Sequence, residues 1–154
     1  MTDNPSFAPR RVVTGLDAEG RSTVIIDGPV PKADNGATQL VWRAASVPAD
    51  NAGSADTSTP FSIDHLKDGS CPFSVVELPV GIPRHMHATD TLDYLVILSG
   101  QIILEMETGE VVLGPGDMIV QRGTMHAWRN DGPEPVRMIS INLPSIPVGG
   151  GATI

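Results

Sequence analysis

Three histidines in two short segments are the residues of this chain best suited to coordination chemistry. His85 and His87 form a His-x-His pair, and His126 follows later in the chain. Residues i and i+2 of an extended strand project from the same face, so the two imidazoles of the pair would lie side by side, as a metal ion requires. A neighbouring strand could bring His126 to the same point. Taken alone, the pair is as consistent with two exposed histidines, or with a pair packed against a barrel, as with a metal site.

Three further residues near these histidines are candidates for a substrate pocket. Trp128 lies two residues past His126 and therefore shares its face, where it would either stack on a substrate or pack in the core. Arg84 precedes His85 and could anchor a carboxylate, although a solvated surface arginine is the commoner case. Gln121 ends the strand before His126 and completes the set. No catalytic residue and no organic cofactor is assigned.

The two histidine segments resemble, in order, the two motifs of the cupin superfamily, over residues 73–143. The first motif is matched by Gly81, His85, His87, Asp93 and Gly100. The second is matched by Gly116-Asp117, Gly123, His126 and Asn130. The chain departs from the family pattern at three places. Asp93 stands where cupins have Glu, one residue further from the histidines. Gly81 is closer to the histidines than usual, and Gln121 stands where cupins have Pro.

The resemblance implies one divalent metal ion bound by His85, His87 and His126, with Asp93 as the fourth ligand. Because Asp is one methylene shorter than Glu, Asp93 could bind directly, bind through a water molecule or orient a histidine. Asp90 is a less favoured substitute for it. Imidazole and carboxylate ligands suit Fe, Mn, Ni, Zn or Cu, and the spacing does not choose among them.

For function, the resemblance favours a metal-dependent enzyme that acts on a small molecule. Dioxygenase, decarboxylase, isomerase and lyase chemistry are all compatible with an ion that polarises a carbonyl, activates water or binds dioxygen. The positive charge left at the ion would favour an oxygenated substrate that is carboxylated or aromatic. A binding or sensing protein without turnover is the alternative, and a scaffold that has lost its metal is a third possibility against which the three histidines argue.

The segments that must position these residues have the sequence pattern of an all-β protein. Residues 11–14 and 22–26 predict a hairpin, residues 38–44 a strand, residues 48–60 a mobile loop, and residues 62–68 one helical turn capped by Ser62. The second half predicts short strands over residues 73–78, 84–88, 94–98, 102–107, 110–112, 118–121, 126–130 and 136–143. We expect one structural domain: a double-stranded β-helix (jelly-roll) barrel over residues 73–147, with residues 1–72 as an N-terminal β-hairpin and loop extension.

Composition narrows the classes of partner and compartment. The formal net charge of −8 argues against nucleic acid as a partner, because phosphate binding needs clustered Lys and Arg. No stretch approaches the roughly 20 apolar residues of a membrane helix. The single cysteine, Cys71, excludes an internal disulfide and favours a cytoplasmic location. The expected partners are a small-molecule ligand and, from the resemblance, a second copy in a homodimer.

Overall fold

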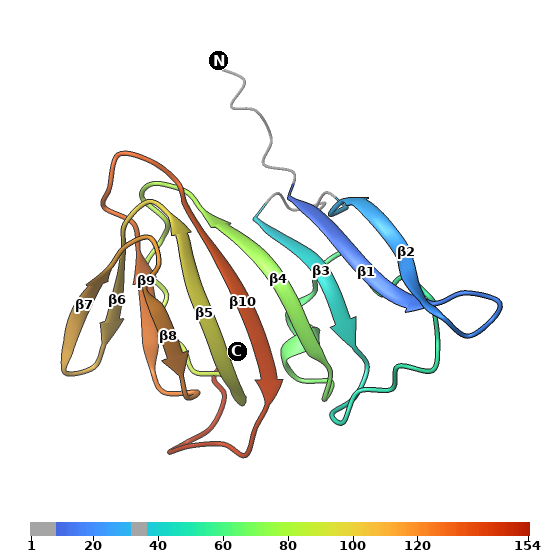
Figure 1. The fold of residues 1–154 in the computed structure, drawn as a ribbon. Coiled ribbons are helices and arrows are strands. Elements are labelled where there is room, and N and C mark those ends of the chain that lie inside the picture. The colour runs from blue at the N-terminus through green and yellow to red at the C-terminus, as the bar shows by residue number, and fades with distance from the viewer. Residues whose placement is uncertain (1–8, 32–36) are drawn as a thin grey trace.

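The computed structural model describes residues 9–31 and 37–154 and shows three antiparallel sheets (Figure 1). The first sheet is the hairpin of β1 (Arg10–Leu16) and β2 (Ser22–Pro29). The second has five strands in the order β3 (Thr38–Ala44), β4 (Cys71–Leu78), β10 (Val136–Pro144), β5 (Thr91–Ser99) and β8 (Met118–Gln121). The third has three strands in the order β7 (Gly109–Leu113), β6 (Ile102–Met106) and β9 (His126–Arg129). The described residues contain no α-helix, only the 3₁₀ turn η1 (Ile63–Leu66), which confirms the all-β prediction.

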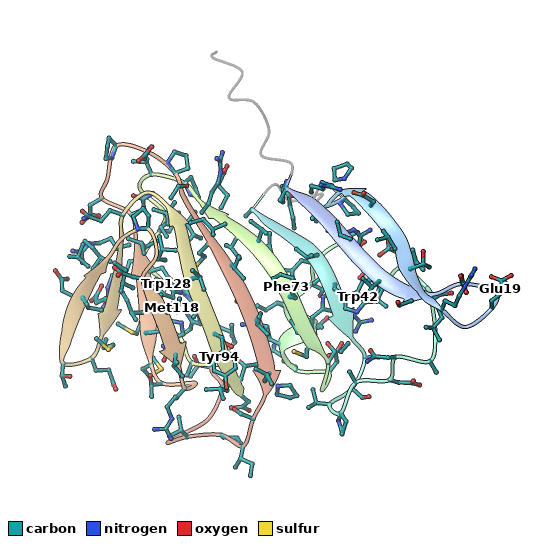
Figure 2. All side chains as sticks on the ribbon, in the orientation of Figure 1. Glu19, Trp42, Phe73, Tyr94, Met118 and Trp128 are labelled. Carbon is teal, nitrogen blue, oxygen red and sulfur yellow. The ribbon has the colours of Figure 1, made fainter. Side chains whose placement is uncertain are left out.

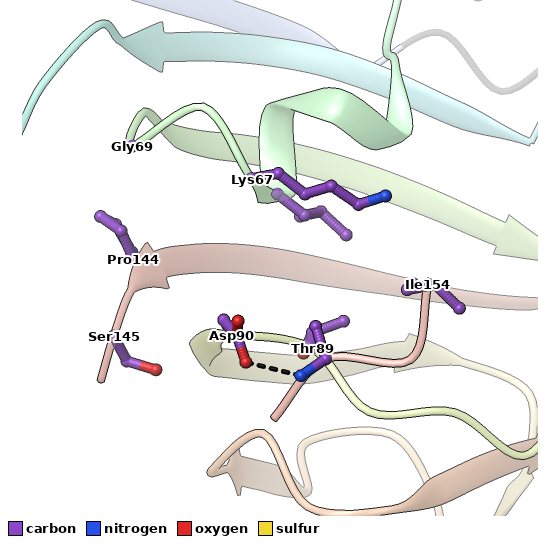
Figure 3. Close-up of a pocket in the computed structure, with 9 residues that line it drawn as sticks. Lys67, Gly69, Thr89, Asp90, Pro144, Ser145 and Ile154 are labelled. Atoms are coloured by element: carbon purple, nitrogen blue, oxygen red, sulfur yellow. Dashed lines mark hydrogen bonds between the residues drawn. The ribbon is translucent and has the colours of Figure 1, made fainter. Parts of the chain in front are cut away.

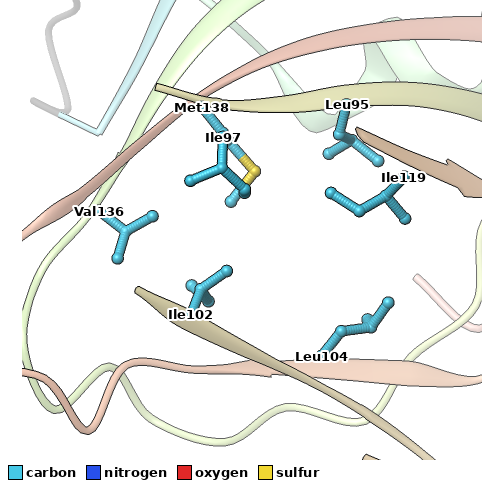
Figure 4. Close-up of a cluster of buried hydrophobic side chains, with 7 residues drawn as sticks. All are labelled: Leu95, Ile97, Ile102, Leu104, Ile119, Val136 and Met138. Atoms are coloured by element: carbon cyan, nitrogen blue, oxygen red, sulfur yellow. The ribbon is translucent and has the colours of Figure 1, made fainter. Parts of the chain in front are cut away.

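The hydrophobic core lies between the five-stranded and three-stranded sheets (Figure 4). Buried residues alternate with half-buried ones along β10, and with half-buried or exposed ones along β5, as expected of strands with one face in the core. The five-stranded sheet contributes Leu95, Ile97, Ile119, Val136 and Met138, and β6 contributes Ile102 and Leu104. Each fully buried side chain of this size stabilises the fold by about 1.5–3 kcal/mol, so this cluster fixes the distance between the sheets.

The predicted N-terminal hairpin is confirmed, although it is longer at both ends than the pattern suggested. Val30, just after β2, packs with Val41 and Val75 in a second small cluster that attaches the hairpin to the sheet. The guanidinium of Arg11 is buried beside it, donates to the Val41 carbonyl oxygen at 2.9 Å, and pairs with the Asp56 carboxylate. The far end of the hairpin, with Glu19, projects away from the barrel (Figure 2).

The short turn predicted over residues 62–68 is also confirmed. Ser62 caps η1 by accepting the Asp64 N–H at 3.2 Å, and the His65 ring accepts the Ser62 N–H in return at 3.3 Å. This exchange is a capping box with histidine in the place that Glu or Gln usually takes. It gives His65, the fourth histidine of the chain, a structural role.

The prediction of a strand over residues 84–88 is wrong. This segment is irregular, and its pairing is reduced to an isolated bridge between His87 and His126. Pro79 and Pro83 lack the N–H that a ladder needs, and Gly81 adopts a left-handed conformation with φ of 69°. The alternation expected of a strand therefore does not govern the His-x-His pair.

Among residues 9–31 and 37–154, no helix has the length and apolar character needed to cross a membrane.

Candidate functional site

A pocket of about 360 Å³ opens into the barrel interior beside the core, a size typical of small-molecule sites. Its walls come from the inward faces of β4, β5 and β10, from β9, and from the segment around η1. The lining residues are Thr38, Phe61, Ile63, Leu66, Ser74, Val76, Leu78, His87, Thr89, Asp93, Leu95, His126, Trp128, Met138, Ser140 and Asn142. Two of the three predicted histidines and the predicted carboxylate thus share one cavity.

His87 and His126 form the centre of this site. Their backbones exchange two N–H···O=C bonds of 2.9 Å, and their rings lie 4.4 Å apart between centroids. The Nδ1 of each ring meets a backbone carbonyl, that of His85 at 2.9 Å for His87 and that of Thr124 at 2.8 Å for His126. A carbonyl can only accept, so Nδ1 carries the proton in both rings, and Nε2 has the free lone pair in the neutral form of each ring. Burial lowers the pKa of His126, which favours the neutral, ligating form.

Asp93 adds a carboxylate with an unused oxygen. The residue is buried opposite Asn142 in the β5–β10 ladder, and its Oδ1 atom has no hydrogen-bond partner among the described residues. Burial raises the pKa of Asp93, against the opposing effects of hydrogen bonds with the Asn142 and Thr91 side chains and of the nearby His87. A buried carboxylate oxygen without a partner is costly unless a ligand satisfies it.

His85, by contrast, lies outside the pocket. Its side chain is exposed, although its ring stacks on that of His87 with centroids 5.3 Å apart. In the described part of the chain, no three His, Cys, Asp or Glu side chains are grouped closely enough to hold a metal ion. The donor types of His87, His126 and Asp93 fit a divalent transition metal, and the third imidazole is displaced because the segment that carries it is not a strand.

The three candidate pocket residues are placed differently from one another. Trp128 lines the pocket, with its ring edge-on to His126 at 5.8 Å between centroids. Arg84 does not line it; its exposed guanidinium pairs with the Glu105 carboxylate at 2.7 Å. Gln121 is buried but organises the turn before His126, where its Oε1 atom accepts from the Arg122 N–H and the Thr124 hydroxyl.

Asp90, the less favoured carboxylate, is engaged elsewhere. Its Oδ1 atom accepts the Ala152 N–H at 2.7 Å, beside a second pocket of about 340 Å³ that Lys67 and Ile154 also line (Figure 3). The next residue of this tail, Thr153, exchanges bonds of 3.0 Å with the backbone of Ala88. The C-terminal segment thus fastens the chain between His87 and Asp93.

The sequence-based prediction missed the polar residues on the five-stranded wall. Ser74, Ser140 and Asn142 are buried and line the pocket. Ser140 and Asn142 could have been recognised from the sequence. In β10 they occupy the same alternating positions as the core residues Val136 and Met138. Polar residues at inward positions of an otherwise apolar strand indicate a site where hydrogen-bond partners other than the apolar core are needed.

Comparison with known proteins identifies the family of the chain. The cupin domain family (Cupin_2) matches residues 74–142. The "Phomopsin biosynthesis cluster protein C'" of Diaporthe leptostromiformis is 36% identical over 135 residues, which cover 79% of this chain and 70% of that protein. The "Cupin-domain-containing oxidoreductase fogC" of Aspergillus ruber is 30% identical over 145 residues, 86% of this chain and 71% of that protein. A solved double-stranded β-helix protein from Klebsiella pneumoniae aligns with a TM-score of 0.44 at 23% identity, over 49% of this chain and 68% of that one.

The fold is a double-stranded β-helix barrel, and His87, His126 and Asp93 line one pocket inside it. The chain belongs to the cupin family.

Proposed function

We propose that the chain is a metal-dependent cupin oxidoreductase that holds one divalent transition metal, Fe, Mn, Ni, Zn or Cu, on His87, His126 and Asp93, with His85 as the third imidazole. One observation carries the proposal: His87, His126 and Asp93 line the same pocket, the two rings use Nδ1 and not Nε2 for their hydrogen bonds to backbone carbonyls, and Asp93 Oδ1 has no hydrogen-bond partner among the described residues. Relatives named cupin-domain-containing oxidoreductases support redox chemistry over the other cupin reactions. Relatives named for biosynthesis clusters support a small-molecule natural product as the substrate.

The described residues have definable tasks in such a reaction. The carbonyls of His85 and Thr124 hold the two rings in one tautomer, and the burial of His126 keeps its imidazole neutral. Trp128 and Leu95 exclude water from the interior. A bound redox-active ion would supply Lewis-acid or electron-transfer chemistry at this point.

The test is metal binding by single histidine variants, with the fourth histidine as the control. The protein is dialysed against a chelator, reloaded with each metal in turn, and analysed for bound metal and for its melting temperature. His87→Ala and His126→Ala should each weaken metal binding at least about tenfold, because each removes a ligand. His65→Ala, which removes a capping histidine, should keep metal affinity while lowering stability slightly.

His85→Ala separates two versions of the site. Weaker metal binding in this variant means that the exposed ring joins the ligand set, and unchanged binding reduces the set to His87, His126 and Asp93. Wild-type protein that takes up no transition metal on reconstitution refutes the proposal. Metal uptake without substrate-dependent oxygen consumption or reduction of an electron acceptor would instead indicate a binding protein without turnover.

A further inference from the structure

The side chain of Ser74 has no hydrogen-bond partner among the described residues. It lies in β4 with 1% of its surface exposed, lines the pocket, and its hydroxyl makes no hydrogen bond to any described residue. An unsatisfied buried hydroxyl costs about 1–3 kcal/mol relative to a satisfied one. Selection for stability alone would favour alanine here, so the hydroxyl points to a ligand that completes it.

Ser74 is one end of a polar row that crosses three strands. It lies directly opposite Ser140 in the β4–β10 ladder, and Asn142 lies opposite Asp93 in the β10–β5 ladder. The two middle members are bonded to each other, with the Ser140 hydroxyl donating to Asn142 Oδ1 at 3.1 Å. The two ends, Ser74 and Asp93, each keep an orphaned oxygen. The row therefore offers a ligand two polar contacts, one of them beside the histidines.

The spacing of these ends limits the size of the ligand. Ser74 and Asp93 are two strands apart and two residues out of register, which separates their backbones by roughly 12 Å. Both side chains project into the pocket from this frame. A six-membered ring with oxygens at opposite positions, plus a hydrogen bond of about 2.8 Å at each end, spans a gap of this order.

The charge of the pocket limits the ligand further. No lysine or arginine among the described residues lines it, and Arg84 is paired outside with Glu105. Apart from the polar row and the histidines, the walls are apolar, with Val76, Leu78 and Met138 as examples. An anionic ligand in this cavity would therefore lose its hydration with no lysine or arginine of the described residues to pair with it.

From these contacts we propose that Ser74 anchors the substrate, and that the substrate is an uncharged, mainly apolar ring compound with hydroxyl or carbonyl oxygens at opposite ends. This proposal deepens the proposed function. It rests on that function only because it concerns the same pocket.

The experiment is isothermal titration of metal-free protein with two probes of matched shape. 4-Hydroxyacetophenone is neutral near pH 6.5, and 4-hydroxybenzoate carries a carboxylate in place of the acetyl group. Wild-type protein should bind the neutral probe at least about tenfold more tightly, because no lysine or arginine of the described residues lines the pocket to pair with the anion. Ser74→Ala should weaken binding of the neutral probe about fivefold, the loss of one hydrogen bond.

Thermal melting separates a binding role for Ser74 from a structural one. Ser74→Ala should leave the melting temperature unchanged or raise it, because it removes an unpaired group. Ser140→Ala, a matched serine on the neighbouring strand, should lower it, because its hydroxyl is bonded to Asn142.

Three results would overturn the proposal: no heat with the neutral probe, equal affinity for the anion, or unchanged affinity in Ser74→Ala. Because the protein is metal-free, these outcomes are independent of metal binding. Failure of the metal proposal with a Ser74-dependent affinity, or the reverse, identifies which of the two inferences is at fault.

Discussion

Gly123 is the residue that allows the two halves of the site to approach each other. It has a left-handed φ of 68°, and a Cβ atom at this position would lie 2.5 Å from the Thr89 carbonyl oxygen. Thr89 stands between His87 and Asp93 in sequence, and Gly123 lies in the turn just before His126. The close contact of the two backbones therefore sets the positions of the ligand-bearing segments.

We expect Gly123→Ala to lose more stability than backbone strain alone explains. Strain at a left-handed residue costs about 1 kcal/mol, and the clash with Thr89 should bring the loss above about 2 kcal/mol. Gly116→Ala is the matched control, because Gly116 is also left-handed with φ of 89° but has open space around it. Urea unfolding of both variants measures the difference, and equal losses would contradict the role assigned to Thr89.

At the scale of single residues, the sequence predicted the donors of the site better than their arrangement. His87, His126, Asp93 and Trp128 all line the pocket. The position of His85 could not be predicted, because it depended on a strand that prolines prevent. Ser74 was overlooked because a lone serine in an apolar strand acquires meaning only when its lack of a partner is visible.

At the scale of elements, the alternating patterns predicted most strands of the barrel, and the failure lies at residues 84–88. The contact that holds the N-terminal hairpin could not be predicted from any pattern, since Arg11 and Asp56 are 45 residues apart and come from a strand and a loop. Such a pairing follows from the tertiary fold and not from local propensity.

This ion pair makes stability dependent on pH in a definite direction. The bond with Arg11 holds the pKa of Asp56 below its ordinary range, so ionised Asp56 stabilises the fold fully above about pH 4 and loses this effect as the pH falls through the lowered pKa. We expect Asp56→Asn to be less stable than the wild type by about 1 kcal/mol at pH 7, allowing for the partial exposure of Asp56. The difference should narrow progressively below pH 4.

Urea unfolding between pH 7 and pH 2 measures this dependence. Asp27→Asn is the control in the same hairpin, because Asp27 and Arg10 form a pair with side chains 47% and 70% exposed. Its effect should be smaller at every pH. A stability difference for Asp56→Asn that stays constant across the range would rule out the ionised pair as its source.

At the scale of the whole molecule, the outer face of the five-stranded sheet is apolar where it reaches its edge. Tyr94, Leu98, Met118 and Val120 are exposed on β5 and β8 (Figure 2). The outward positions of these two strands hold no charged residue, in a chain of net charge −8. An uncharged face is where two acidic copies can meet without repulsion, and β8 is the last strand of its sheet.

We therefore expect a homodimer formed through β8 and the outer face of β5. Light scattering coupled to size-exclusion chromatography should give twice the chain mass for the wild type and the monomer mass for Val120→Lys. Val112→Lys changes another exposed valine, on β7 of the other sheet, and should remain dimeric. A wild-type monomer at micromolar concentration would refute this expectation.

The edge-on contact of Trp128 with His126 has a consequence for how this protein can be observed. An indole that borders the cavity changes its fluorescence when the surrounding water or a neighbouring ring is replaced. The chain has one other tryptophan, Trp42 in β3, which does not line the pocket. In a Trp42→Phe background, emission therefore becomes an optical signal of cavity occupancy, and a library of candidate compounds can be screened without knowing the reaction.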